Sequence, residues 1–399
     1  MITVGAAFGP GQHGPLIAEE LLAAGFSGQR FFLFPELRTE RYDGGICAEQ
    51  KVFRSFGILQ RAVWATWIRI PGLSDSTAPV SVTFSLADRL LASQLQPCDI
   101  FLGWSQISLH CMRRAKQLGA KVFLEHPMAN VKEWMELVSA EYAEWGKGGN
   151  YYSNFPKQVV DRMLAEYDEA EKIVVLSTFA KNSFIKHGVP AEKLHLIPLG
   201  IDTRKFAAKT AYRVDGKLRV LYVGRLELLK GLQYLLRAFS ELKSDNIELH
   251  LIGRRLPEIE AIIAEYADER VFVHGEVPHD ELPLRYREAD VFVFPTVNDS
   301  FGLAVLEAMA SGLPVITTEN SCGHDVVSDG EDGFVVPIRD SAAIRQKIVH
   351  FLNDRSCVET MGRRSRNRIM GDLTVEHYRK RLLDLFQFGQ HESKNTSTT

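Results

Sequence analysis

Short apolar runs alternate with amphipathic segments along most of the chain, which predicts strands separated by helices. The predicted strands are Ile2–Ala7, Arg30–Phe34, Pro97–Trp104, Lys121–Glu125, Lys172–Ser177, Lys193–Pro198, Leu218–Tyr222, Ile247–Ile252, Val271–His274, Asp290–Pro295, Pro314–Thr318 and Gly333–Pro337. Several intervening helices end at a glycine, a common C-terminal signal. Strands that alternate with helices in both halves predict an α/β protein with two doubly wound parallel sheets that face a cleft.

The length of the chain also favours two domains. A chain of 399 residues is too long for one ordinary core and suits two domains of roughly 150–200 residues. We expect an N-terminal domain over residues 1–200 and a C-terminal domain over 201–374, with a hinge near Leu199–Asp202. An amphipathic helix at 375–390 is expected to pack back on the N-terminal domain, and residues 391–399 to form a disordered polar tail.

The composition narrows the class of protein. The net charge of -3 argues against a general nucleic-acid binder, which is usually basic. The cysteines are scattered without a CxxC pair, so they indicate neither a zinc site nor a disulfide framework, and they suit a reducing cytoplasm. The chain starts without the basic and apolar regions of a signal peptide, and no apolar run reaches the ~18–20 residues that span a bilayer. These features predict a cytoplasmic protein with no metal site.

Residues 51–71 combine four basic and four aromatic residues and contain no acid. This composition suits peripheral contact with the anionic inner face of a membrane. The alternative is a core helix whose arginines extend outward to water. We favour the core helix, because the apolar residues form no single stripe.

Two features of the N-terminal half are candidates for ligand contact. A glycine-rich turn that includes Gly9 and Gly11 follows the first predicted strand. It either lets a ligand approach the backbone or forms a tight turn without a ligand, and the pattern leaves both interpretations open. His126 follows the strand Lys121–Glu125. Ligands gather beyond the carboxyl ends of strands in open α/β sheets, so His126 is a candidate, although structural histidines also occur at strand ends.

A pair of cations follows the first strand of the second half. Arg225 comes directly after Gly224, and Lys230 lies five residues further on. Two cations at the mouth of a cleft can neutralise a diphosphate, because arginine offers a fork that matches phosphate oxygens and lysine a compact charge. The alternative is ordinary surface charge paired with an acid such as Glu227.

The most informative stretch is Phe294–Gly323. Asp299 lies in a polar loop before a predicted helix whose first turn is Phe301–Ala304, and Glu307 lies about two turns up that helix. Free backbone N–H groups between two carboxylates form a site for a phosphorylated, hydroxyl-rich ligand. Alternatively, Asp299 or Ser300 caps the helix, and the two roles of Asp299 are compatible, because a carboxylate has two oxygens.

Together, these motifs resemble the retaining, nucleotide-sugar-dependent glycosyltransferases of family 4 (the glycosyl transferases group 1 type), which have the two-domain GT-B fold. The motifs are Gly224-Arg225-Leu226-x-x-x-Lys230-Gly231, the run from Asp299 through Phe301, Gly302, Leu303 and Glu307 to Gly312 and Pro314, and Asp329-Gly330-x-x-Gly333. The resemblance is good from about Tyr167 to Phe388 and loose before it.

The resemblance implies a role for each of these residues. Arg225 and Lys230 would hold the donor diphosphate, and Glu307 would bind the ribose hydroxyls of the nucleotide. Backbone N–H groups near Gly302 and Leu303 would contact the transferred sugar or its phosphate.

Three further residues match the family less closely, or match it only by their position in the chain. Asp299 stands where the family usually has a glutamate that contacts the transferred sugar, so its reach is one methylene shorter. His126 matches a strand-end histidine that approaches the donor sugar, and Gly11 lies in a turn where the family's paired glycines are not cleanly reproduced. The predicted nucleotide-sugar site therefore comprises Gly11, Gly224, Arg225, Lys230, Asp299, Phe301, Gly302, Leu303 and Glu307, and the predicted catalytic residues are His126, Arg225, Lys230 and Asp299.

The implied reaction moves a sugar from a UDP- or GDP-sugar to a hydroxyl of a glycan, lipid-linked or small-molecule acceptor, in glycan, polysaccharide or glycolipid synthesis. The chain has no Asp-x-Asp motif, which suits a metal-independent enzyme with no cofactor beyond the donor. No second carboxylate is obvious as a nucleophile, so same-face substitution with retention is expected. The alternatives are a nucleotide-sugar epimerase, a sugar phosphorylase or a non-catalytic nucleotide-sugar-binding protein.

Overall fold

The computed structural model describes the backbone of residues 3–8, 27–32, 37–43, 46–53, 78–146 and 155–396, and the side chains of residues 84–146 and 155–386. Gly11 and residues 54–71 lie outside the described residues, so the predictions for the glycine turn and for most of the basic aromatic segment stay predictions.

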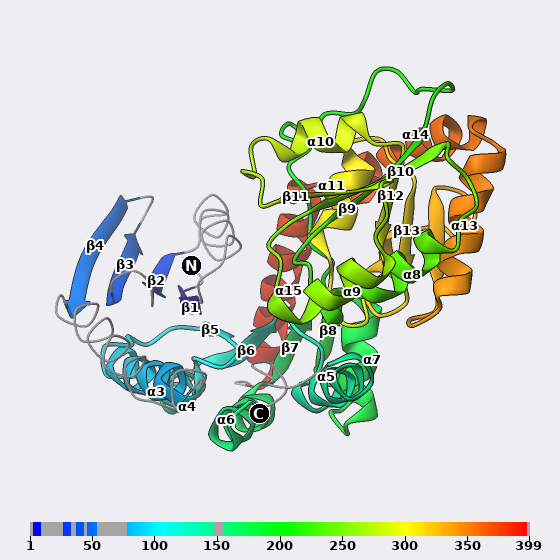
Figure 1. The fold of residues 1–399 in the computed structure, drawn as a ribbon. Coiled ribbons are helices and arrows are strands. Elements are labelled where there is room, and N and C mark those ends of the chain that lie inside the picture. The colour runs from blue at the N-terminus through cyan, green and yellow to red at the C-terminus, as the bar shows by residue number, and fades with distance from the viewer. Residues whose placement is uncertain are drawn as a thin grey trace.

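The N-terminal domain contains an eight-stranded sheet with strand order β4-β3-β2-β1-β5-β6-β7-β8 (Figure 1). Its strands are β1 (Thr3–Phe8), β2 (Ser27–Phe32), β3 (Leu37–Asp43), β4 (Ile46–Phe53), β5 (Ile100–Trp104), β6 (Lys121–His126), β7 (Lys172–Val175) and β8 (Leu194–Leu196). Its described helices are α3 (Ala78–Ala92), α4 (Leu109–Gln117), α5 (Val131–Trp145), α6 (Lys157–Glu169) and α7 (Thr178–Lys186), with a 3-10 turn η1 (Ala191–Lys193). From β2 to β8 in this order, neighbouring strands run parallel.

The sequence does not predict β3 and β4, which form an antiparallel hairpin at the edge of this sheet. Many of their residues are charged or polar, so they lack the apolar run on which the strand prediction rests. Gly44 and Gly45 separate the two strands in the sequence, and a glycine pair between strands is a hairpin signal that the prediction missed. The N-terminal sheet is therefore mixed rather than wholly parallel.

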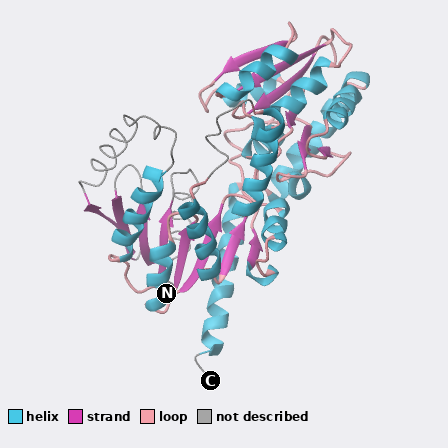
Figure 2. Ribbon diagram, turned by 60° about the horizontal axis from the view of Figure 1, so that its bottom comes forward, coloured by secondary structure: helices cyan, strands magenta, loops and turns pink. Residues whose placement is uncertain are grey.

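The C-terminal domain contains a parallel sheet with strand order β11-β10-β9-β12-β13-β14, and helices pack around both sheets of the molecule (Figure 2). Its strands are β9 (Leu218–Val223), β10 (Ile247–Ile252), β11 (Val271–Gly275), β12 (Val291–Phe294), β13 (Val315–Thr318) and β14 (Gly333–Val336). Its helices are η2 (Leu228–Lys230), α8 (Leu232–Ser240), η3 (Pro257–Ile259), α9 (Glu260–Tyr266), α10 (Leu282–Glu288), α11 (Leu303–Ala310), α12 (Gly323–Val326), α13 (Ser341–Asn353) and α14 (Ser356–Asp372). All strands predicted for this half are present, because their apolar side chains fill one buried core.

The order of the C-terminal strands creates a switch point. The chain leaves β9 for β10 on one side and returns to β12 on the other, and both strands pair with β9. Such a reversal opens a crevice beyond the carboxyl ends of the two central strands. The segments that follow β9 and β12 are the two that carry the predicted donor-binding residues.

The chain crosses between the domains twice, and the two crossings lie side by side. The backbone N–H of Ile201 donates to the carbonyl of Leu373 at 2.9 Å, and the N–H of Val375 donates back to Ile201 at 3.3 Å. Beside them, a Cβ on Gly200 would lie 2.1 Å from the carbonyl oxygen of Thr374. Glycine is therefore required where the two segments touch.

The last helix, α15 (Val375–Thr396), packs back on the N-terminal domain, as the sequence predicts (Figure 1). The rings of Phe386 and Phe123 stack with centroids 5.9 Å apart, and the hydroxyl of Tyr378 donates to Glu125 at 3.4 Å. The helix continues to Thr396, beyond the predicted end at residue 390 and into the segment expected to be disordered.

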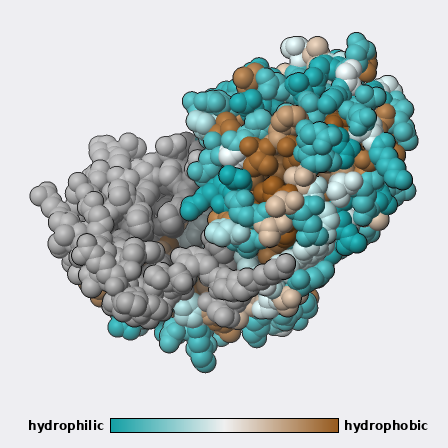
Figure 3. All heavy atoms as spheres, viewed as in Figure 1, coloured by the Kyte–Doolittle hydropathy of each residue, from teal (hydrophilic) through white to brown (hydrophobic). Residues whose placement is uncertain are grey.

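The described surface of the C-terminal domain is mostly hydrophilic on the side that Figure 3 shows, with a small apolar area. Among the helices that the structure describes, none is both long enough and apolar enough to cross a membrane.

Candidate functional site

The turn that carries Lys230 is fixed against the segment that follows β12. The carbonyl of Leu229 accepts bonds from the backbone N–H groups of Val297 at 3.0 Å and Asn298 at 3.2 Å, and from the Thr296 hydroxyl at 3.0 Å. Gly231 ends the turn with a φ of 70°. A Cβ there would lie 1.8 Å from the carbonyl oxygen of Pro295, so only glycine lets the two segments approach this closely.

Lys230 and Asp299 meet across these two segments. The Lys230 ammonium lies 2.6 Å from Oδ2 of Asp299, and both side chains are largely but not fully buried. Oδ1 of Asp299 accepts the backbone N–H of Phe301 at 3.1 Å. Both carboxylate oxygens are therefore engaged, one by the predicted cation and the other by the backbone ahead of α11. The cap residue of α11 is Gly302, without a side-chain bond, and the contact of Asp299 with the transferred sugar stays a prediction.

The helix α11 begins at Leu303 rather than at Phe301, two residues later than predicted. The cause is Gly302, which has a left-handed backbone with φ 82° and ψ 68°. A Cβ at this glycine would lie 2.8 Å from the ring of Phe294. Phe301 is buried in the core, so its side chain contributes packing. Only its backbone lies at the predicted ligand site.

Glu307 lies on α11 and is almost fully buried. The hydroxyl of Tyr286 donates to its Oε2 at 2.7 Å, and Nε2 of His279 lies 3.2 Å from its Oε1. Sequence reasoning missed both partners, because nothing in the pattern of α10 and the residues before it marks them out. These two polar contacts fix the orientation of the carboxylate, which binding to the two hydroxyl groups of a ribose requires.

Arg225 follows β9 and extends into partly open space, with about half of its side chain exposed. Its guanidinium lies 2.9 Å from the carboxylate of Glu227, the acid that the alternative interpretation names. Burial raises the pKa of Glu227, while the positive charges of Arg225 and Lys230 lower it.

His126 is fully buried at the end of β6. Its Nε2 lies 3.1 Å from the carbonyl oxygen of Ala129, and its ring packs edge-on against Tyr167 and Phe184. Burial lowers the pKa of His126 to about 4, so the ring is neutral near pH 7. Its Nδ1 has no hydrogen-bond partner among the described residues.

The end of β6 nevertheless touches the C-terminal site. The hydroxyl of Ser300, next to Asp299, donates to the backbone carbonyl of Pro127, next to His126. The structure thus brings the strand end that carries His126 against the loop that carries Asp299. Of the predicted residues whose side chains are described, Lys230 and Asp299 make direct side-chain contact with each other, whereas His126 and Glu307 are each held by other partners.

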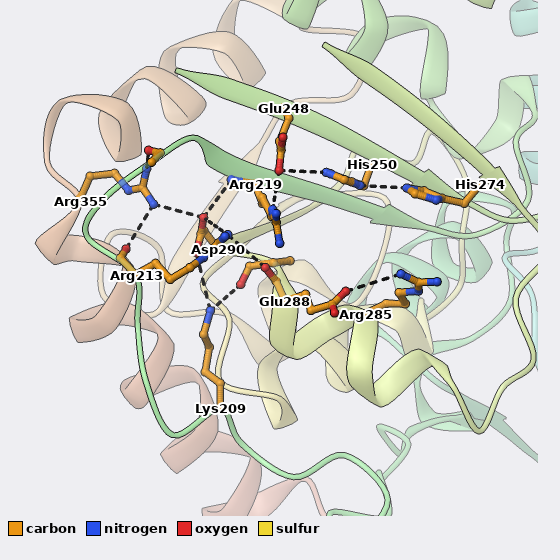
Figure 4. A network of polar contacts seen from close by, with 12 residues as sticks. Lys209, Arg213, Arg219, Glu248, His250, His274, Arg285, Glu288, Asp290 and Arg355 are labelled. Atoms are coloured by element: carbon orange, nitrogen blue, oxygen red, sulfur yellow. Dashed lines mark hydrogen bonds and ion pairs between the residues drawn. The ribbon is translucent and has the colours of Figure 1, made fainter. Parts of the chain in front are cut away.

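A second polar cluster lies on the β11 side of the C-terminal sheet (Figure 4). A cavity of about 290 Å³ is lined there by Arg219, Leu221, His250, Ile252, His274, Arg285, Glu288 and Ala289. His250 and His274 share a hydrogen bond of 2.9 Å, and Arg219 pairs with Glu248 beside them. Arg285 lies 3.6 Å from Glu288. The opposite charges largely cancel, so this cluster links the strands to α10 without a net charge to select a ligand.

Among the described residues, one group could share a metal ion: Glu133, Glu136 and His187. The ammonium of Lys186 already binds both carboxylates, at 2.5 and 3.0 Å. An ion would have to displace this lysine, so the group is better explained as a surface ion-pair cluster.

Comparison with known proteins agrees with this geometry. Residues 217–354 match the family described as Glycosyl transferases group 1. A putative colanic acid biosynthesis glycosyltransferase, WcaL of Salmonella typhimurium, is 27% identical over 58% of this chain and 61% of its own length. A capsular polysaccharide biosynthesis glycosyltransferase, CapM of Staphylococcus aureus, is 33% identical over 52% of this chain and 56% of its own. The chain thus spans less than two thirds of these relatives.

Solved structures show the same fold over the whole chain. A sucrose-phosphate synthase from Thermosynechococcus elongatus aligns over 100% of both chains with a TM-score of 0.71 and 20% identity. Anabaena Alr3699/HepE, solved in complex with UDP and glucose, aligns over 97% of this chain and 100% of its own with a TM-score of 0.63 and 14% identity. These matches confirm the predicted GT-B fold, and the family match and the two relatives above support the resemblance to glycosyltransferases.

Proposed function

We propose that this protein is a retaining, metal-independent glycosyltransferase that moves a sugar from a nucleoside-diphosphate sugar to a hydroxyl group in polysaccharide synthesis. The observation that carries the proposal is the position of Lys230. It lies at the switch point of the C-terminal sheet, on a turn bonded to the segment after β12, close to a helix start and to Asp299. The Lys230 cation and the N–H groups at the start of α11 lie together at the crevice of the switch point. This is the place where α/β sheets bind phosphorylated ligands.

In this proposal the donor diphosphate binds Arg225 and Lys230. Charge develops on the diphosphate as the bond to the sugar breaks, and preplaced cations that lie at that charge lower the barrier. Glu307, held by Tyr286 and His279, accepts hydroxyl groups of the ribose. UDP is the favoured nucleotide, because the structural neighbour HepE was solved with UDP and glucose.

The stereochemistry of the transfer depends on what lies at the face of the sugar opposite the leaving diphosphate. A double displacement needs a carboxylate there as a nucleophile. The sequence shows no obvious second carboxylate for this role, and Oδ1 of Asp299 accepts the Phe301 N–H. We therefore favour same-face substitution, in which the leaving diphosphate accepts the proton of the acceptor hydroxyl.

The acceptor belongs to the same proposal. Relatives named for colanic acid and capsular polysaccharide biosynthesis support a glycan acceptor, free or lipid-linked. Peripheral contact of residues 51–71 with a membrane would place the N-terminal domain near a lipid-linked acceptor, and this contact stays a prediction.

The test begins with a panel of UDP-, GDP- and ADP-sugars. A donor at a hundred times its Kd should stabilise the fold by about 2.7 kcal/mol, visible as a higher unfolding temperature. Release of nucleoside diphosphate should then require an acceptor, whereas an epimerase would convert the donor alone. The configuration of the product settles the stereochemistry: an inverted anomeric centre would exclude same-face substitution.

A further inference from the structure

The helix α5 of the N-terminal domain carries a carboxylate that is buried against the C-terminal domain. Glu141 has no exposed surface. Its oxygens accept bonds from Gln233 Nε2 at 2.8 Å and from the Tyr234 hydroxyl at 3.0 Å, and they pair with the guanidinium of Arg339. All three partners belong to the C-terminal domain. Because a buried carboxylate is costly without such partners, this cluster is stable only when the two domains are in contact.

Arg339 has an unusual backbone. Its φ of 63° lies in the left-handed region, which residues other than glycine rarely adopt. Strain of this kind costs about 1–3 kcal/mol and persists only where the surroundings fix it. Glycine would adopt the same turn without strain. The presence of arginine therefore indicates that its side chain, and not the turn alone, is needed at this position.

The same cluster connects to the turn that carries Lys230. Gln233 Nε2 also donates to the carbonyl of Leu228 at 3.0 Å, so one amide group binds both Glu141 and the first residue of η2. The next residue, Leu229, accepts the backbone bonds from the loop after β12. Hydrogen bonds on either side of the peptide link between Leu228 and Leu229 thus join α5 to both segments of the proposed donor site.

We propose that Glu141 and Arg339 form an interdomain latch that positions Lys230 for the donor diphosphate. The effects on kcat and KM that we expect from this latch rest on the proposed function. Glu141 and Arg339 are positioning residues, because they act through Gln233 and η2 and touch no substrate themselves. The latch links contact between the domains to the placement of the cation, so the donor site is complete only in the domain arrangement that brings the two halves of the site together.

The experiment compares four single variants of the full chain and the double variant that combines Glu141→Gln with Lys230→Ala. Glu141→Gln keeps the size of the side chain and removes its charge, and Arg339→Gly removes the side chain and relieves the backbone. Glu144→Gln is the matched control, because this residue is exposed on the same helix. Lys230→Ala removes the positioned cation. UDP affinity is measured by calorimetry, and kcat and KM with the donor found in the panel.

Both latch variants should weaken UDP binding and lower kcat/KM for the donor by about tenfold, since small displacements of a charged group cost this much or more. Glu144→Gln should behave as the wild type. In the Lys230→Ala background, Glu141→Gln should have little further effect, because the residue that the latch positions is gone.

Two outcomes would overturn the latch: wild-type UDP affinity in Arg339→Gly, or a full, additive loss for Glu141→Gln on top of Lys230→Ala. If Glu141→Gln fails to fold, the test uses Arg339→Gly, in which the backbone strain is relieved and Glu141 keeps its bonds from Gln233 and Tyr234. Failure of the proposed function would look different. The wild type would then turn over no donor, while UDP binding would still show whether Glu141 and Lys230 are coupled.

Discussion

At the scale of single residues, each proposed donor contact already has a partner inside the chain. Lys230 pairs with Asp299, Arg225 with Glu227, and Glu307 with Tyr286. Donor binding is therefore an exchange of partners rather than the filling of empty positions. Charge-assisted bonds to phosphate replace the contacts that are lost, so the gain on binding is the difference between the two sets of contacts.

Lys230→Ala tests the proposed diphosphate contact. Loss of a hydrogen bond to a charged group costs about 1.5–3 kcal/mol, so UDP should bind about 10- to 100-fold more weakly. The unfolding temperature should fall by only a few degrees, since the Lys230–Asp299 pair is partly exposed. Calorimetry with UDP and a thermal scan of the same sample separate the two effects. Unchanged UDP affinity would remove Lys230 from the site.

Asp299→Asn tests the exchange itself. The amide oxygen can still accept the Phe301 N–H, but the charge that competes with the diphosphate for Lys230 is gone. An exposed pair contributes at most about 1 kcal/mol, and this pair is largely buried, so UDP should bind about fivefold more tightly or better. Weaker UDP binding would instead show that Asp299 places Lys230 more than it competes for it.

At the scale of elements, the proposed site depends on how closely η2 approaches the end of β12. Gly231→Ala places a Cβ where the structure has the Pro295 carbonyl, in a left-handed conformation that alanine adopts at a cost of roughly 1–2 kcal/mol. We expect lower stability and weaker UDP binding together. Gly216→Ala is the matched control, because its φ is 73° and nothing lies within 4 Å of the added Cβ.

The difference between these two alanine variants isolates the contact from the backbone strain. If Gly231→Ala is no more destabilising than Gly216→Ala, the close approach of η2 to β12 is not what fixes the site. Urea unfolding measures the difference, and calorimetry with UDP shows whether the displaced turn carries Lys230 away with it.

The same scale explains what the sequence could and could not predict. Most strands of the C-terminal sheet are apolar, buried and bounded by turn residues, so their pattern identifies them. Their order, and with it the switch point, comes from the structure. The hairpin of β3 and β4 was not predicted, because an edge hairpin rich in polar residues has no apolar run. Contacts such as Tyr286 with Glu307, or Glu141 with Arg339, could not be predicted for a different reason. They join segments far apart in the chain, and only the tertiary structure brings them together.

At the scale of the whole molecule, α15 and the paired crossings tie the two domains together. Glu125 on β6 lies under this helix and is buried, with the Tyr378 hydroxyl beside it. Burial raises the pKa of Glu125 from the ordinary value of 4.5 to about 7, and the contact with Tyr378 offsets only part of this effect. The carboxyl is therefore protonated in the folded chain at pH values where the unfolded chain has already lost the proton.

This difference gives a stability that depends on pH. Between pH 4.5 and 7 the folded state binds more protons than the unfolded state, so the contribution of Glu125 to stability falls as the pH rises. The total change is at most about 3 kcal/mol, from 1.36 kcal/mol for each pKa unit. Glu125→Gln stays neutral and lacks this term. Its free energy of unfolding, relative to the wild type, should rise steadily from pH 4.5 to 7 and then level off.

Urea unfolding of both proteins at a series of pH values measures this difference directly. Glu166 is also buried, with a pKa raised to about 7, but it is present in both proteins and cancels. Tyr378→Phe adds a second check, because loss of the hydroxyl contact should raise the pKa of Glu125 in the folded chain further and extend the upper end of the window to higher pH. A difference between Glu125→Gln and wild type that stays constant with pH would mean that Glu125 is already ionised in the folded chain, and that α15 covers a solvated carboxylate rather than a buried acid.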